Sequence, residues 1–220
     1  MLLTGFPAGM LACNCYVLAQ RQGSDAVIVD PGQRAFGPLQ RILDENRLTP
    51  AAVLVTHGHV DHIWSAQKVA DTFGCPVYIH PADRFMLSDP IRGFGPRIAQ
   101  FAFGAMFREP RQIVELDRDG AVLDLGGITV AVDHTPGHTR GSVCFRVLDE
   151  DVVFTGDTLF KQSVGRTDLP GGSGRDLLDS IITKLLVLDD DTRVMPGHGQ
   201  ATFIGAERTT NPFLQGITSL

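Results

Sequence analysis

The sequence predicts an α/β fold in which helices cover a central pair of sheets. Short runs rich in valine and isoleucine recur along the chain, and between some of them apolar residues return every three to four positions. Several of the short runs end in glycine, histidine or aspartate. Hydrophobic residues make up 43% of the 220 residues and charged residues 20%, which is typical of a globular protein, so we expect one domain over residues 1–220.

Strands are predicted where a short apolar run lies between turn signals. The runs are AVIVD (26–30), AAVLVT (51–56), PVYI (76–79), ITVAV (128–132), SVCFRV (142–147) and DVVFTGD (151–157). A further run, RVM, precedes Pro196. Loops beyond the strand ends form the usual binding crevice of such sheets, so we expect the polar residues that follow these runs to meet at one site.

Helices are predicted at two places where apolar side chains share one face. Leu39, Ile42 and Leu43 mark the first. The second follows GGSG and contains Leu177, Leu178, Ile181, Ile182, Leu185 and Leu186. Ser173 is expected to cap this second helix, with Asp176 in its first turn.

Residues 81–112 hold five of the thirteen phenylalanines together with several arginines. One interpretation is a helical insertion with a packed apolar face, since aromatic residues mostly serve cores. The alternative is a lid over the site or a dimer contact. Under the lid hypothesis, replacing Phe94 or Phe101 by alanine changes KM without unfolding the protein.

The net charge of -6 argues against a nucleic-acid surface. No stretch is apolar enough to span a bilayer, and the start, MLLTGFPAGMLACNCYVLA, lacks the basic segment of a secretion signal. We therefore expect a cytoplasmic protein that binds neither nucleic acid nor membrane, as a monomer or a homodimer.

The four cysteines, Cys13, Cys15, Cys75 and Cys144, form no CxxC pair. Cys13 and Cys15 lie in an apolar run, where buried free thiols are common. A structural role is expected for them, and neither a disulfide framework nor a zinc ribbon is indicated.

Histidines and aspartates beside glycines follow several of the predicted strands. The segment THGHVDH, residues 56–62, is the densest of these, and we expect a turn there that runs into a helix at Ile63. One divalent ion needs about four imidazole or carboxylate ligands. The chain offers enough for two ions: His57, His59, Asp61, His62, His138, Asp157 and His198.

The segments THGHVDH, HTPGHTRGS, FTGDTLF and MPGHG, in this order, resemble the metallo-β-lactamase superfamily, whose fold is an αββα sandwich of two mixed sheets flanked by helices. The resemblance runs from about Asn14 to His198. Within the superfamily, NCYVL, VDPG and GDTLFKQSVGRTDLPGG look like the glyoxalase II (hydroxyacylglutathione hydrolase) group and its shorter bacterial relatives.

The resemblance implies two divalent ions, with zinc expected and iron or manganese as alternatives. It assigns His57, His59 and His138 to one ion, Asp61, His62 and His198 to the other, and Asp157 to both. With a hydroxide that bridges the ions, Asp61 and Asp157 would be the catalytic residues. β-Lactamases of the best-known class usually carry cysteine in place of Asp157, and flavodiiron proteins usually carry glutamate in place of the second histidine of the loop; neither substitution is present. The other two histidines, His80 and His134, are expected to pack or hydrogen-bond near the site without touching metal.

The implied reaction is attack by the bridging hydroxide on the carbonyl of a thioester of a low-molecular-weight thiol. Two ions about 3.5 Å apart lower the pKa of a shared water and stabilise the oxyanion. A thiol with a pKa of about 8.5 leaves with little help from an acid. The chain shows no GxSxG elbow, so no serine nucleophile is indicated.

Substrate recognition departs from the glyoxalase II pattern. Full-length enzymes of that group add a helical domain, whereas 22 residues follow His198 here. Arg166 stands where those enzymes usually carry lysine, Asp168 replaces a tyrosine, and Gly199-Gln200 replaces another aromatic position. Glutathione is therefore not the expected carrier. The residues considered for binding an anionic part of another thiol are Arg166, Arg140 and Lys161, with a solvated surface arginine as the alternative reading.

Two other functions stay open. GRTD (165–168) and NPFL (211–214) also resemble persulfide dioxygenases, which use one iron held by two histidines and an aspartate. The third reading is a protein that keeps a metal site for folding or partner binding. Seven ligands for two ions leave open coordination positions, which favours catalysis over a closed structural site.

Overall fold

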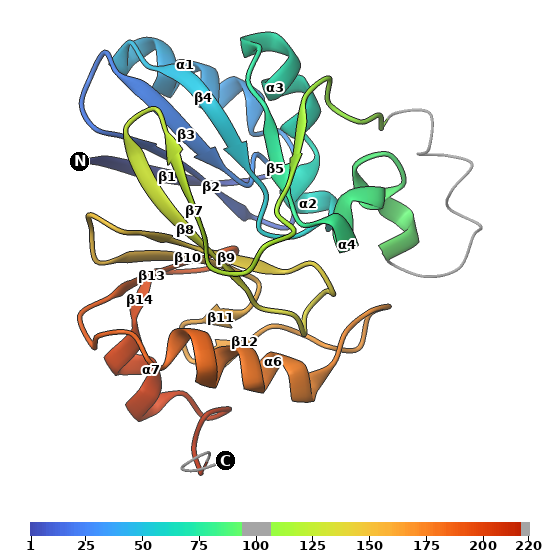
Figure 1. The fold of residues 1–220 in the computed structure, drawn as a ribbon, viewed down its shortest axis with the longest axis vertical. Coiled ribbons are helices and arrows are strands. Elements are labelled where there is room, and N and C mark those ends of the chain that lie inside the picture. Colours follow the sequence, from blue (N-terminus) through green and yellow to red (C-terminus); the bar gives the residue numbers. More distant parts are fainter. Residues whose placement is uncertain (94–106, 217–220) are drawn as a thin grey trace.

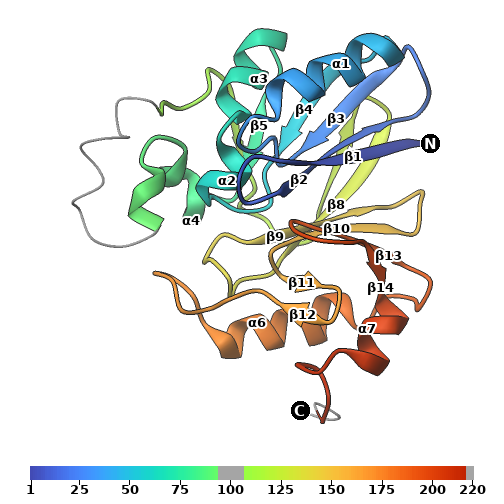
Figure 2. The same ribbon diagram turned by 180° about the vertical axis from the view of Figure 1, so that it is seen from behind.

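The computed structural model describes residues 1–93 and 107–216, and these form four layers (Figure 1). Helices α1 (Phe36–Asn46) and α3 (Ala66–Phe73) cover the outer face of one sheet. Helices α6 (Gly174–Ser180) and α7 (Ile204–Thr210) cover the outer face of the other, and the view from behind shows the same order of layers (Figure 2). The predicted α/β fold with two sheets between helices is confirmed.

The first sheet is six-stranded, in the order β1-β2-β3-β4-β5-β6. Its strands are β1 Leu2–Ala8, β2 Cys13–Ala19, β3 Asp25–Val29, β4 Thr49–Leu54, β5 Val77–Ile79 and β6 Ile113–Glu115. The first three strands pair antiparallel and the last four pair parallel, so the sheet is mixed.

The second sheet is also six-stranded and mixed, in the order β14-β13-β10-β9-β8-β7. Its strands are β7 Ala121–Leu125, β8 Ile128–His134, β9 Val143–Val147, β10 Val152–Gly156, β13 Arg193–Pro196 and β14 Thr202–Phe203. Only β10 and β13 pair parallel. A separate two-stranded ribbon, β11 (Leu159–Phe160) with β12 (Ser163–Val164), follows β10.

Strand β3 shows why the central strands are continuous apolar runs: both of its faces are buried. Ala26 and Ile28 pack into the cluster under α1 and α3, whereas Val27 and Val29 pack into the cluster between the two sheets. A third apolar cluster lies between the second sheet and the helices α6 and α7. The loops at the ends of β3 and β4 are thus held by a core on either side.

The predicted strands and helices are found within a few residues of the expected ends, and Ser173 caps α6 as predicted. The Ser173 side chain accepts a hydrogen bond from the backbone N–H of Asp176. The α-helix stops at Ser180, and a π-helical turn, Ile181–Leu185, continues it. Strands β1 and β2 were not predicted from the sequence; β1 is an edge strand of the first sheet, and β2 lies between β1 and β3.

The expected start of the helix after the THGHVDH motif was wrong. Helix α2, Val60–Ile63, begins inside the motif, so Asp61 and His62 lie on a helical turn and not in the preceding bend. His59 has extended backbone angles and is the N-cap residue of this turn. The extended loop and the short helix together allow four side chains to reach one region.

The described part of the phenylalanine-rich segment contains α4 (Pro81–Arg84) and two 3₁₀ turns, Phe85–Leu87 and Pro90–Gly93. Phe94 and Phe101 lie outside the described residues, so the lid hypothesis stays a prediction. Across residues 1–93 and 107–216, no helix has the length and apolar character that crossing a membrane requires.

Candidate metal centre

The candidate ligands come from loops at one edge of the two sheets. β3, β4, β8, β10 and β13 all end at this edge, and β2, which is antiparallel to β3, begins there. The segments after β4, β8, β10 and β13 carry all seven residues expected from the sequence, with Asp61 and His62 on α2. Six of the seven have buried or largely buried side chains, and the exposed fraction of the His198 side chain is 27%.

Three imidazoles form the first group of donors. The Nε2 atom of His57 lies 3.1 Å from Nδ1 of His59, and Nε2 of His138 lies 2.8 Å from the same Nδ1 atom. These three nitrogen atoms all lie within 4.8 Å of one another. Three histidine donors at this spacing can share one metal ion.

The second group joins α2 to the loop after β13. Nε2 of His62 lies 3.3 Å from Nε2 of His198, and Oδ2 of Asp61 lies 3.1 Å from the same His198 atom. Asp157 stands between the groups: its Oδ1 is 3.4 Å from Nε2 of His62, and its Oδ2 is 3.7 Å from Nε2 of His138. One carboxylate therefore faces both sets of donors.

The charges at the site suit neutral imidazole ligands on one side and a cation on the other. Burial lowers the pKa of His57 well below its usual value and that of His59 to about 3, and neighbouring histidines add to the effect. Burial alone would lower the pKa of His62 as well, but its neighbours, first Cys13 and then Asp157 and Asp30, raise it well above its usual range. The position of His62 thus favours positive charge nearby.

These groups of donors fit divalent metal ions, because they consist of the imidazole and carboxylate atoms that such ions prefer. Gly197 keeps the space open. A Cβ atom at this position would collide with Oδ1 of Asp157 and with Cε1 of His62. A side chain at residue 197 would therefore fill the space that an ion needs.

Hydrogen bonds on the far side of the rings fix the orientation of the histidines, as is usual for metal ligands. Nδ1 of His62 lies 2.9 Å from Oδ2 of Asp30. Nδ1 of His138 lies 2.8 Å from the carbonyl oxygen of Arg166, and Nδ1 of His198 lies 2.9 Å from the carbonyl oxygen of Leu11. These contacts leave the Nε2 atoms of all three rings directed toward the other donor atoms.

Asp30 had not been identified as a site residue from the sequence, although it is the last residue of the predicted run AVIVD. It adopts a left-handed backbone angle, with φ of 48°, and its exposed fraction is 2%. Its carboxylate accepts hydrogen bonds from the backbone N–H and the hydroxyl of Thr56, at 2.8 and 2.6 Å. Asp30 therefore ties the end of β3 to the start of the histidine loop.

Asp83 was also not identified, and it connects two ligand loops. Its Oδ2 accepts from the backbone N–H of Gly58 (2.9 Å) and the hydroxyl of Thr139 (2.7 Å), and its Oδ1 accepts from the backbone N–H of Gly141 (3.0 Å). Burial raises its pKa, and these hydrogen bonds oppose the rise. A carboxylate on a polar helix, PADR, gives no local sign of this role.

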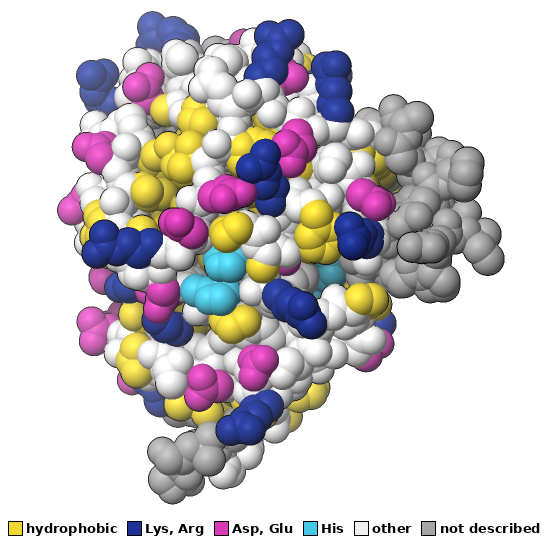
Figure 3. Space-filling model, turned by 45° about the vertical axis from the view of Figure 1, so that its right-hand side comes forward, with side chains coloured by type: hydrophobic (Ala, Val, Ile, Leu, Met, Phe, Trp, Pro, Cys, Tyr) yellow, Lys and Arg dark blue, Asp and Glu magenta, His cyan; other side chains and the backbone are white. Residues whose placement is uncertain are grey.

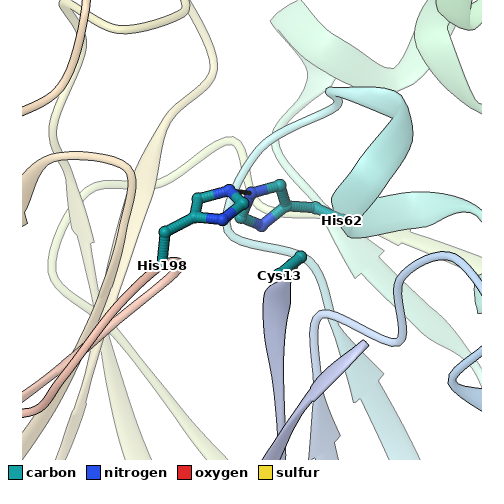
Figure 4. Close-up of side chains that lie close together, drawn as sticks. All are labelled: Cys13, His62 and His198. Atoms are coloured by element: carbon teal, nitrogen blue, oxygen red, sulfur yellow. Dashed lines mark hydrogen bonds between the residues drawn. The ribbon is translucent and has the colours of Figure 1, made fainter. Parts of the chain in front are cut away.

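Cys13 lies beside the second group of donors (Figure 4). Its Sγ atom and the ring nitrogens of His62 and His198 all lie within 4.8 Å of one another. The cysteine is completely buried, and burial raises its pKa to about 11. All four cysteines are buried free thiols, as expected. Cys13 differs from what was expected because two candidate metal ligands lie beside it.

His80 and His134 lie outside both groups of donors. Their rings stack on each other with centroids 4.2 Å apart and planes 7° from parallel. His134 also makes a hydrogen bond through Nε2 with the carbonyl oxygen of Arg140, at 2.9 Å. Figure 3 shows histidine side chains at the molecular surface among acidic and basic side chains.

The three candidate substrate residues differ in their surroundings. Arg166 forms a bidentate pair with Asp168, at 2.8 and 2.7 Å, and Lys161 donates to the side chain of Gln200 at 2.8 Å. Arg140 has no such partner among the described residues, and it lines a pocket of about 290 Å³ with Arg92. The pocket is completed by Ala82, Asp83, Phe85, Met86, Thr139, Pro170 and Gly171. Of the three, Arg140 is therefore the one whose charge is available beside the ligand loops.

The chain is similar to known proteins over nearly its whole length. The model of the metallo-beta-lactamase superfamily matches residues 8–198. A protein of Mycobacterium tuberculosis is 74% identical over 223 residues, covering 99% of this chain and 100% of the relative. The hydroxyacylglutathione hydrolase GloC of Haemophilus influenzae is 37% identical over 206 residues, covering 91% of this chain and 92% of the relative.

Solved structures share the fold over nearly the full chain. BLEG-1, a B3 metallo-beta-lactamase, matches with a TM-score of 0.85 and 40% identity, covering 98% of this chain and 100% of that one. TTHA1623 in a di-iron-bound form matches with a TM-score of 0.77 and 36% identity, covering 94% and 97%. ETHE1 from Myxococcus xanthus matches with a TM-score of 0.76 and 26% identity, covering 96% and 84%.

Proposed function

Because the chain belongs to the metallo-β-lactamase superfamily, we propose that it is a dinuclear metal-dependent hydrolase that cleaves the thioester of a low-molecular-weight thiol. His57, His59 and His138 would hold one ion, and Asp61, His62 and His198 would hold the other. When bound, a pair of divalent ions supplies an activated water as nucleophile and stabilises negative charge on the carbonyl oxygen of the substrate.

The position of Asp157 is the observation that carries the proposal. Its carboxylate lies near both donor groups: Oδ1 lies 3.4 Å from His62 of the second group, and Oδ2 lies 3.7 Å from His138 of the first group and 3.6 Å from His198 of the second. A carboxylate between two sets of ligands suits two neighbouring ions better than one. The carboxylates of Asp61 and Asp157 add negative charge that offsets the charge of the ions.

The protein's own residues orient these groups. Asp30 accepts from His62 and keeps that ring turned into the cavity. Asp83 accepts hydrogen bonds from the backbone of Gly58 and the side chain of Thr139, so it fixes the position of the His57–His62 segment relative to the His138 loop. Such backing contacts typically change metal affinity or activity by about 10- to 100-fold when they are removed.

A thioester substrate is supported by the 37% identity with GloC, whose name is hydroxyacylglutathione hydrolase. It is also supported by chemistry: a thiolate is a good leaving group near neutral pH, because the ordinary thiol pKa is about 8.5. Arg140 and the pocket of about 290 Å³ would receive an anionic part of the thiol carrier or the acyl group. Arg166 is the weaker candidate because it is already paired with Asp168.

The test is hydrolysis of S-lactoyl thioesters of glutathione, mycothiol and bacillithiol by the full chain loaded with two equivalents of zinc. We expect turnover of at least one thioester, and a loss of on the order of 100-fold or more in His57→Ala and Asp157→Ala proteins. Absence of turnover above these two variants, in a protein shown to hold two ions, would remove the thioester proposal.

Two further activities belong in the same experiment. The similarity to BLEG-1 makes β-lactam hydrolysis a candidate, and a β-lactam that is cleaved faster than every thioester would replace the thioester reading. GRTD, NPFL and the similarity to ETHE1 support the persulfide dioxygenase alternative. That alternative requires one iron per chain and oxygen consumption with a persulfide, whereas our proposal requires two ions and no oxygen consumption.

A further inference from the structure

We propose that Cys13 is an additional ligand at the position of Asp61, His62 and His198, and that its thiol gives this position a preference for zinc over manganese. The inference rests on the proposed two-ion centre. It concerns the identity of the metal, which the seven histidine and aspartate ligands leave open, because imidazole and carboxylate together suit several divalent ions.

The backbone holds Cys13 directly against the loop of His198. Cys13 and His198 form an isolated antiparallel β-bridge. The next residue, Asn14, donates its backbone N–H to the carbonyl oxygen of Gly197 at 2.7 Å, and its side-chain amide donates to Pro196 and Gly199 at 3.0 Å each. These contacts anchor the start of β2 to both sides of His198, so the backbone of Cys13 is held beside the site.

The donor atoms are spaced for a shared ion. Sγ of Cys13, one ring nitrogen of His62 and one ring nitrogen of His198 all lie within 4.8 Å of one another. A zinc ion lies about 2.3 Å from a sulfur ligand and about 2.0 Å from a nitrogen ligand, so small side-chain rotations bring all three atoms to one ion. His62 comes from α2 and His198 from the loop after β13, so the sulfur adds a third element to the same position.

Packing accounts for the other three cysteines but not for Cys13. Cys15 and Cys75 belong to the apolar cluster under α1 and α3, and Cys144 belongs to the cluster under α6 and α7. Cys13 is equally buried, yet within the described part of the chain it belongs to none of the three apolar clusters. Its hydrogen bond runs to the carbonyl oxygen of Asn14 at the long distance of 3.9 Å.

A sulfur ligand changes which ion this position prefers. Thiolate is a soft ligand that suits zinc, whereas carboxylate and water suit manganese. Binding of the ion would form a metal–sulfur bond and release the thiol proton to solvent. Without the sulfur, the ligands of this ion would be imidazoles and the carboxylates of Asp61 and Asp157. Carboxylates are hard ligands, so this set would favour zinc over manganese less strongly.

Cobalt(II) is the probe, because a cobalt–thiolate bond gives a charge-transfer band in the near ultraviolet that imidazole and carboxylate ligands do not give. The reduced full chain is stripped with a chelator and titrated with cobalt(II) without oxygen. We expect the chain to bind two equivalents of cobalt(II) and the band to increase as only one of them binds. Cys13→Ala should remove the band and lower the affinity for that cobalt ion by about 10- to 100-fold. The matched control is Cys15→Ala, a change on the same strand in the apolar cluster, which keeps the band.

A wild-type protein that binds two cobalt ions without the band, or a Cys13→Ala protein that keeps it, overturns this inference and leaves the proposed hydrolase intact. A wild-type protein that binds no cobalt overturns both. Cys13→Ser is a second variant in case the alanine variant folds poorly. Competition between zinc and manganese tests the selectivity: we expect Cys13→Ser to lower the zinc preference by about tenfold or more, and an unchanged ratio contradicts it.

Discussion

At the scale of single residues, the candidate ligands are oriented by polar groups that do not belong to the donor set. Asp30 is the clearest case, because one carboxylate binds Nδ1 of His62 and both the N–H and the hydroxyl of Thr56. Removing a charged hydrogen-bond partner from a fully buried ring leaves that ring free to turn. The orientation of His62 is therefore set by a residue at the end of a different strand.

Asp30→Asn should weaken binding of the ion held by His62 by about 10- to 100-fold while leaving the fold intact. Asparagine tolerates the left-handed backbone of residue 30 and keeps the shape of the side chain, but it loses the charge. A zinc titration against a chromophoric chelator measures the effect.

The control for this prediction is Asp25→Asn, an exposed carboxylate at the other end of β3. It should bind zinc as the wild type does. Equal zinc affinity in Asp30→Asn and wild type would show that the carboxylate is not needed to orient the ring.

At the scale of elements, α4 serves as a connector between the two ligand loops of the first donor group. Asp83 on this helix receives hydrogen bonds from the loop after β4 and from the loop after β8, which belong to different sheets. A short helix outside both sheets can thus control the distance between His57 and His138.

Asp83→Ala should lower the free energy of unfolding by about 3 kcal/mol, because two buried backbone N–H groups and a hydroxyl lose a charged acceptor. Urea unfolding of the metal-free protein should show a lower midpoint. Asp89→Ala, which changes a partly exposed carboxylate in the turn after Phe85–Leu87, should leave the midpoint within experimental error of the wild type. Equal midpoints for the two variants would contradict the connector role.

At the scale of the whole molecule, the candidate metal centre joins the two sheets. His57, His59, Asp61 and His62 follow the first sheet, whereas His138, Asp157 and His198 follow the second. Ligands that bind only the folded state stabilise it by mass action, so ions shared between the sheets oppose their separation.

Removing the metal should lower the melting temperature by on the order of 10 °C, because an ion at a thousand times its Kd contributes about 4 kcal/mol. Calorimetry before and after treatment with a chelator measures this, and adding zinc should restore the original value. His57→Ala should show a smaller difference between the loaded and stripped forms. A melting temperature that does not respond to the chelator, in a sample shown to have lost its ions, would rule out a bridging contribution.

The sequence by itself determined the apolar strands, the cap at Ser173 and the seven donors, because each of these signals lies within a few neighbouring residues. The ends of the elements were less certain: α2 begins at Val60 because the extended His59 already caps it, which the expected helix start at Ile63 did not anticipate. Features that depend only on neighbouring residues can thus be predicted from the sequence.

Only the tertiary structure decided which residues surround those donors. Asp30 lies 32 residues from His62, and Asp83 lies 56 residues from Thr139, so no local pattern connects either pair. Cys13 reaches the site because β2 runs antiparallel to β3, which brings its first residue to the edge where β3 and β4 end. Strand direction and sheet order, which are set by pairing between distant segments, therefore decided the surroundings of the candidate ligands.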